Sequence, residues 1–252
     1  MRKAIITLIS AVAFGVTGQA MAAGGVEIPK RDWSFQGIFG SYDRASAQRG
    51  FQVYQEVCAG CHSLNYIYYR NLMELGYSEA AVKAFAAESE VEDGPNDEGE
   101  MFMRPAVPSD RLVKPFPNAQ AARASNGGAL PPDLTLMVEA RIGGPNYLYS
   151  LLTGYTDPPA DVEVMEGMNY NAYFAGHQIA MAAPLSEDAV EYADGTKATV
   201  AQMAEDITVF LAWASEPNME ERKGMGMKVM LFLIVFCGLL IAVKRRVWAD
   251  VH

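Results

Sequence analysis

Three residues that can do chemistry stand within five positions of one another in the stretch VCAGCHSL: Cys58, Cys61 and His62. Such a group is found in zinc half-sites, redox dithiols, structural disulfides and covalent haem attachment sites. A structural zinc site needs four ligands, usually in two pairs. The sequence has no second CxxC or HxxxH pair, and its only other histidines are His177 and His252. The composition therefore argues against zinc.

The surroundings of the motif separate the remaining chemistries. A thioredoxin-like dithiol needs a βαβ context, whereas residues 43–57 predict a helix that Ser41 or Asp43 can cap. The expected apolar face of that helix consists of Ala45, Phe51, Tyr54 and Val57. A disulfide would leave the adjacent His62 without a role. CxxCH is the attachment signature of c-type haem, in which two thiols bind the vinyl groups and the histidine binds the iron. The motif therefore indicates one covalently bound haem c.

The second axial ligand of the iron decides what such a haem does. An open position suits ligand binding or peroxide chemistry, whereas a methionine gives a closed electron carrier of higher potential. The chain has 14 methionines, so their number selects none of them. Met181 stands out in the apolar stretch HQIAMAAPL, and His177 in the same stretch competes as a nitrogen ligand. The residues alone leave both candidates open.

Both ends of the chain carry membrane signals. Residues 1–22 combine two cations, an apolar run and a small-residue cleavage pattern, which is typical of a bacterial secretory signal peptide. Residues 224–243 include fifteen consecutive residues without a charge, and three cations follow directly. Cations mark the cytoplasmic side of a membrane span. We therefore expect a periplasmic haem domain at 23–223, one inner-membrane anchor at 224–243 and a cytoplasmic stub at 244–252.

The charge of the expected exported part is strongly negative. Residues 4–221 contain 12 Lys and Arg against 29 Asp and Glu, a net charge of −17. Seven of these carboxylates lie in ESEVEDGPNDEGE, residues 88–100, whose composition predicts a solvated loop. So acidic a domain repels nucleic acid and attracts basic proteins. The partners we expect are therefore proteins and membrane lipid, and no nucleic acid.

The remaining segments predict long loops and one further helix. Residues 104–120 and 126–135 are proline-punctuated loops. Residues 199–217 predict an amphipathic helix that Thr199 caps. The expected apolar face of this helix consists of Val200, Met203, Ile207, Phe210 and Ala214. The sequence contains no phosphate loop, Ser/His/Asp arrangement or basic patch.

Taken together, these stretches resemble the cytochrome c1 family, the haem subunits of the cytochrome bc1 complex (ubiquinol–cytochrome c reductase). The resemblance covers nearly all of the mature chain. It rests on CAGCHSL, DGPNDEGEMFMRP, KPFPNAQAARASNGGALPPDLT, ARIGGPNYLYSLLTGY and IAMAAPL, in that order. It implies a mainly α, class I c-type cytochrome domain with long loop insertions, plus one C-terminal transmembrane helix.

The resemblance also implies roles for individual residues. Cys58 and Cys61 match the positions of the haem thioethers, and His62 matches the proximal iron ligand. Met181, in the family's IAM motif, matches the sixth ligand, which makes His177 a loop residue. The remaining matched positions lie around the haem: Asn126, Pro131 and Pro132 line it, Arg141 meets a propionate, and Tyr147 is nearby.

The implied function is one-electron transfer within the complex, and the chain is not expected to be an enzyme on its own. The Rieske iron–sulfur protein would reduce this haem, which would in turn reduce a basic soluble or tethered cytochrome c. Contact with the cytochrome b subunit and assembly in a dimeric complex are also implied. Two rival functions remain: a membrane-anchored haem peroxidase or sensor with an open iron, and a structural module with a Cys58–Cys61 disulfide and no haem.

Overall fold

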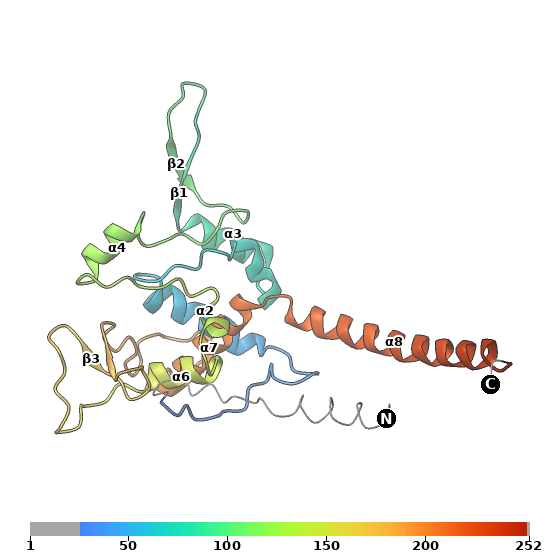
Figure 1. Cartoon of the computed structure of the whole chain (residues 1–252). Helices are drawn as coiled ribbons and strands as arrows, with labels where there is room; N and C mark the ends of the chain where they lie inside the picture. The colour runs from blue at the N-terminus through green and yellow to red at the C-terminus, as the bar shows by residue number, and fades with distance from the viewer. Residues whose placement is uncertain (1–25, 251–252) are drawn as a thin grey trace.

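Two helices far apart in the sequence cross at the centre of the haem-motif domain (Figure 1). They are α2, Arg44–Val53, and α7, Val200–Ser215, in a computed structural model that describes residues 26–250. A Cβ atom on Gly50 of α2 would lie 2.0 Å from the carbonyl oxygen of Asp206 on α7. Only glycine permits so close a backbone approach. The predicted signal peptide, residues 1–22, lies outside the described residues.

Both central helices begin where the sequence predicts. The carboxylate of Asp43, rather than the Ser41 hydroxyl, caps α2 by accepting hydrogen bonds from the N–H groups of Ala45 and Ser46 at 3.0 and 3.1 Å. The Thr199 hydroxyl caps α7 by accepting from Gln202 N–H at 3.1 Å.

The buried faces of these helices differ in part from the prediction. Ala45 is exposed, and Ala47 and Val53 are buried instead. Residues 206–214 of α7 are all buried, so its second half is covered on every side rather than along one stripe. The reason is the position of α7, which is enclosed by α2, α5 and α6.

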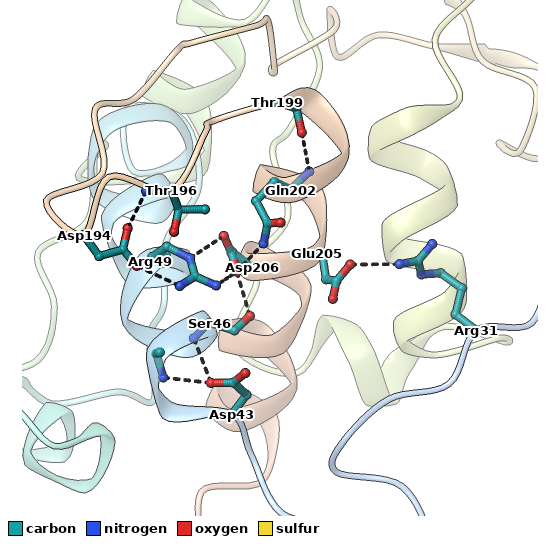
Figure 2. A network of polar contacts seen from close by, with 11 residues as sticks. Arg31, Asp43, Ser46, Arg49, Asp194, Thr196, Thr199, Gln202, Glu205 and Asp206 are labelled. Carbon is teal, nitrogen blue, oxygen red and sulfur yellow. Dashed lines mark hydrogen bonds and ion pairs between the residues drawn. The ribbon is translucent and has the colours of Figure 1, made fainter.

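A buried ionic network fixes the crossing of α2 and α7 (Figure 2). The Asp206 carboxylate has no exposed side-chain surface, and it accepts two hydrogen bonds from the Arg49 guanidinium, both at 2.9 Å. It also accepts from the Ser46 hydroxyl at 2.7 Å and from the Gln202 amide at 3.1 Å. Arg49 reaches Asp194 as well, at 2.9 Å. The hydrogen bond to Asp206 raises the pKa of Arg49 further above its ordinary value. A charge buried this deeply is tolerated because each partner is satisfied.

The other elements surround this pair. A π-helical turn, η1 (Tyr54–Cys58), continues α2, and a 3-10 helix, η2 (Tyr69–Leu75), precedes α3 (Glu79–Ala87). Three short helices follow a hairpin: α4 (Ala119–Ser125), α5 (Met137–Ala140) and α6 (Pro145–Thr153). Strands β3 (Asn169–Tyr170) and β4 (Gln178–Ile179) form a second small hairpin, in which Asn169 pairs with Ile179. The mainly helical domain with long loops confirms the expected fold class.

The acidic segment 88–100 is only partly the solvated loop that its composition predicts. Strands β1 (Glu90–Asp93) and β2 (Phe102–Pro105) pair antiparallel, with Glu90 opposite Pro105 and Asp93 opposite Phe102. The resulting hairpin projects from the domain (Figure 1). Arg104 on β2 forms ion pairs with Asp93 on β1 and with Asp110 in the loop that follows β2, which stabilise the hairpin and offset part of its negative charge.

Helix α8, Met219–Val247, extends far from the domain (Figure 1) and is long and apolar enough to cross a membrane. It begins five residues before the predicted anchor and continues through the three cations that follow it. Its first turn belongs to the domain core, since Met219 is buried. Glu220 forms a two-pronged ion pair with Arg44, at 2.9 and 2.7 Å, and accepts from Tyr42 N–H at 2.8 Å. The helix is therefore a rigid continuation of the domain.

Candidate functional site

The CxxCH motif begins at Cys58, the last residue of η1, which is the π-helical turn that continues α2. The N–H of Ala59 binds the carbonyl of Tyr54 at 2.7 Å, which closes a turn one residue wider than an α-helical turn. The N–H groups of Cys61 and His62 then both donate to the carbonyl of Cys58, at 3.1 and 2.9 Å. Both thiols and the imidazole are thus carried by one compact turn at the end of the central helix.

The imidazole of His62 is oriented by a hydrogen bond from its own ring. Nδ1 lies 2.7 Å from the carbonyl oxygen of Pro132, and because a carbonyl only accepts, Nδ1 carries the proton. Nε2 is then the nitrogen with a lone pair for a metal. Burial lowers the pKa of His62, while the Pro132 carbonyl and the Asp133 charge act in the opposite direction. The neutral, oriented imidazole is the form that binds iron.

Asp133 holds the Pro132 carbonyl in this position, and the sequence analysis did not identify it. One carboxylate oxygen accepts from the Ser63 hydroxyl at 2.9 Å and from Asn65 N–H at 2.7 Å. The other accepts from Thr135 N–H at 3.0 Å. These bonds join the loop after the two prolines to the residues that directly follow His62. The sequence feature that could have indicated Asp133 is its position as the acidic residue directly after the two prolines in NGGALPPDLT.

The two thiols of the motif have different environments. Cys58 is partly buried against the core, and burial raises the pKa of its thiol to about 12, with a smaller contribution from Cys61. Cys61 is exposed, and neither cysteine is bridged in the structure. Tyr54, buried beside them, donates its hydroxyl to the backbone carbonyl of His62 at 3.1 Å. The tyrosine therefore fixes the histidine backbone from the core side.

The two candidates for the second axial ligand have different surroundings. Met181 follows β4 with a half-buried side chain, and its carbonyl accepts the Tyr155 hydroxyl at 3.1 Å. His177 lies at the end of the β3–β4 turn with a φ of 58°. Its ring stacks on Tyr170 with centroids 5.7 Å apart, and its Nδ1 is 3.4 Å from the carbonyl of Asn171. The hairpin thus supplies local partners for His177, as expected of a loop residue.

The other predicted site residues lie on three separate segments. Asn126 ends α4, where its side-chain amide donates to the Ala122 carbonyl at 2.7 Å. Pro131 is half-buried beside the exposed Pro132. Arg141 is exposed just after α5, and Tyr147 on α6 is half-buried. Burial raises the pKa of Tyr147, and the charge of Arg141 opposes that rise. Among these residues, the contacts of the described chain join only Pro132 directly to His62.

The chemistry of this donor set fits a covalently attached haem. Two thiols and an imidazole with Nε2 available come from one turn, and a carbonyl fixes the imidazole tautomer. Within residues 26–250 no group of three or more His, Cys, Asp or Glu side chains is placed to hold a metal ion. Two thiols and one imidazole on a single turn suit a ligand that supplies most of its own metal coordination, as a porphyrin does.

Comparison with known proteins gives consistent matches along the whole domain. A family model described as "Cytochrome C1 family" matches residues 33–251. A protein of Rhodospirillum rubrum named "Cytochrome c1" is 46% identical over 100% of this chain and 98% of its own length. An Arabidopsis thaliana protein named "Cytochrome c1 1, heme protein, mitochondrial" is 56% identical over 88% of this chain and 72% of its own length. A Candida albicans protein named "Cytochrome b-c1 complex catalytic subunit, mitochondrial" is 49% identical over 94% of this chain and 83% of its own length.

Proposed function

We propose the function of this chain from one premise: the chain belongs to the cytochrome c1 family. As a member, it binds one covalent haem c and is a haem electron-transfer subunit of the cytochrome bc1 complex. It is a membrane protein whose single candidate span is α8 within the part of the chain that the structure describes. The rival functions of a haem peroxidase or sensor and of a haem-free structural module have no support among its relatives.

The proposed residue roles start from the CxxCH turn. Cys58 and Cys61 would hold the haem through thioether bonds, and His62 would bind the iron through Nε2. The observation that carries this assignment is the 2.7 Å hydrogen bond from His62 Nδ1 to the Pro132 carbonyl. It leaves the other ring nitrogen as a lone-pair donor and fixes the ring plane before any metal is bound. Asp133 acts as a positioning residue for that carbonyl.

In this proposal Met181 would be the second protein ligand of the haem iron. The Tyr155 hydroxyl fixes the backbone at Met181, whereas the His177 ring is held against Tyr170 in the hairpin. When bound, haem iron with a thioether ligand supplies a one-electron couple of relatively high potential. The remaining site residues would line the haem: Asn126, Pro131 and Pro132 would contact the macrocycle, and Arg141 with Tyr147 would interact with a propionate.

Membership in the complex implies the cytochrome b subunit and the Rieske iron–sulfur protein as partners. Beyond this, we propose that the Rieske protein is the direct electron donor and that a basic soluble or tethered cytochrome c is the acceptor. The net charge of −17 over residues 4–221 supports a basic acceptor. We further propose that the haem domain lies on the periplasmic side of the inner membrane and that the complex is dimeric. The three cations at the end of α8 support this orientation.

The chain on its own is proposed to be an electron carrier and not an enzyme. The word "catalytic" in the name of the Candida albicans relative describes a subunit of a whole complex. The residues around His62 would bind the haem, orient its histidine ligand and keep water from it. None of these tasks makes or breaks a substrate bond. Oxidation of quinol is then the activity of the assembled complex, in which this chain passes single electrons onward.

An absorption spectrum of the reduced, purified complex tests the proposal, recorded with and without carbon monoxide. A closed His–Met site leaves the spectrum of this haem unchanged by carbon monoxide. Binding of carbon monoxide to the native reduced haem would instead support an open site and overturn the carrier assignment. A haem stain after denaturing electrophoresis checks covalent attachment, and a Cys61→Ser variant is the matched control that should lose part or all of the stain.

A further inference from the structure

The turn that precedes α2 separates its apolar side chains into two groups. Trp33, Phe35 and Tyr42 are buried and stack together, with the Phe35 ring centroid 5.7 Å from Trp33 and 5.4 Å from Tyr42. Ile38 and Phe39, at the tip of the same turn, are 66% and 83% exposed. The core therefore accepts the flanking aromatic residues and leaves the two tip residues outside.

The conformation of this turn is fixed by its backbone. Ser41 N–H donates to the Ser34 carbonyl at 3.1 Å, which closes a turn of eight residues, 34–41. Gly37 has a φ of 74°, a conformation that side chains disfavour. A Cβ atom on Gly40 would lie 2.0 Å from the carbonyl oxygen of Gln36. Exposure of the two tip residues is thus built into the fold.

The same turn is bonded to the beginning of α8. The ammonium group of Lys223 donates to the carbonyl of Phe35 at 2.6 Å and to that of Gly40 at 3.1 Å. In Figure 1 the blue segment before α2 extends in the same direction as α8, alongside its first turns. The turn and the helix therefore form one rigid unit.

The length of α8 sets the height of this unit in a bilayer. A hydrocarbon core about 30 Å thick needs about 20 helical residues. Counting about 20 residues back from Val243 places the boundary near Gly224, next to Lys223. Lys228 lies just inside that boundary and can extend its ammonium group to the surface. Lys223, and the turn bonded to it, then lie at the level of the lipid headgroups.

We propose that Ile38 and Phe39 insert into the headgroup–acyl boundary of the bilayer around α8, so that residues 34–41 form a second, interfacial membrane contact. The proposal rests on α8 as the membrane span. Apolar side chains at this depth move favourably from water into the boundary between the lipid headgroups and the acyl chains. Residues 33–42 contain no charged side chain, and the nearby Glu220 carboxylate is paired with Arg44. The charge and the shape of the turn both favour lipid over water.

Site-directed spin labelling of the assembled complex in phosphatidylcholine vesicles tests this contact. The chain has three cysteines, and the haem binds Cys58 and Cys61. Replacing the third, Cys237 on α8, with Ala leaves the introduced cysteine as the one free thiol of this chain to label. Phe39→Cys is the test variant, and Ile38→Cys is a second one in case the first does not assemble. Phe102→Cys on β2 is the aqueous control, and Ile241→Cys on α8 is the membrane control. Accessibility to oxygen and to a water-soluble nickel chelate is measured with the haem reduced.

A lipid contact gives the label at position 39 an oxygen-to-nickel accessibility ratio severalfold higher than at position 102. A ratio equal to that at 102 would mean that the tip faces water and would overturn the proposal. A label that is immobilised and inaccessible to both reagents would show that a protein subunit covers the tip, which overturns it as well. A nickel-accessible label at 241 would instead refute the span itself. Quinol-driven reduction of the haem stays normal in either case, so the electron-transfer function is judged separately.

Discussion

Replacing Asp133 with Ala tests the anchoring of the axial histidine. The change removes three hydrogen bonds, at 2.9, 2.7 and 3.0 Å, that join the Pro132–Thr135 segment to Ser63 and Asn65. A hydrogen bond to a charged acceptor contributes about 1.5–3 kcal/mol. Water can replace part of the bonds from Ser63 and Asn65, because these two residues are only partly buried. We therefore expect the free energy of unfolding to fall by about 2–4 kcal/mol in total.

Urea unfolding of the full-length chain in detergent measures this loss. For a urea slope of about 2 kcal/mol per M, the expected shift in the midpoint is about 1–2 M. The haem reduction potential should also rise. A Pro132 carbonyl that has moved away from Nδ1 makes His62 a weaker electron donor, which disfavours the oxidised iron.

Two control variants separate local from general effects. Asp133→Asn keeps one carbonyl oxygen as an acceptor. Its free energy of unfolding should therefore fall by about half as much as that of Asp133→Ala. Asp110→Ala removes a carboxylate that binds Val107 N–H at 2.8 Å and Arg104, so it should lower stability without changing the potential. If Asp133→Ala left both the midpoint and the potential unchanged, the argument that Asp133 positions the histidine would be refuted.

Four further predictions concern other parts of the molecule. Met181→Leu should leave the haem attached but lower its potential, because the soft thioether favours reduced iron; an unchanged potential in a redox titration would exclude Met181 as the ligand. Gly50→Ala should destabilise by about 3 kcal/mol, since its Cβ meets α7 backbone, and a melting curve like that of the unmodified chain would contradict the close crossing. A chain ending after Pro217 should have a lower melting temperature than one ending after Gly226, which keeps the hydrogen bonds of Glu220 and Lys223. Equal melting temperatures would show that these bonds do not stabilise the domain. The rate at which the acceptor is reduced should fall as ionic strength rises. Changing Glu90, Glu92 and Asp93 of β1 to their amides should weaken that dependence. If the rate of the variant still depended steeply on ionic strength, the docking surface would lie elsewhere.

The elements that local chemistry defines were predictable from the sequence. Asp43 and Thr199 are side chains that cap helices wherever they precede an apolar periodic segment, and both helices begin at them. The apolar run before three cations gave α8 in the same way. The CxxCH spacing indicated the cofactor, because two thiols and an adjacent histidine, in a sequence with no second CxxC or HxxxH pair, have few other uses.

What depended on distant contacts was not predictable. Nothing in the local pattern shows that α7 would be enclosed on all sides, since that follows from packing against three other helices. The antiparallel β1–β2 pair was missed because β1 consists mostly of carboxylates and the adjacent apolar residues of β2, Phe102 and Met103, do not alternate with polar ones. Asp133 looked like one more acidic loop residue, and only its bonds to residues some 70 positions earlier give it a role.

The rigid junction between α8 and the domain has a consequence for bilayer thickness. A single span adapts to a thinner or thicker membrane by tilting. A flexible linker would absorb such a tilt, but the Glu220–Arg44 pair and the buried Met219 transmit it to the whole domain. A tilt of about 10° moves a point about 30 Å from the end of the helix by about 5 Å. Lipid composition thereby becomes a determinant of how far this domain stands from its redox neighbours.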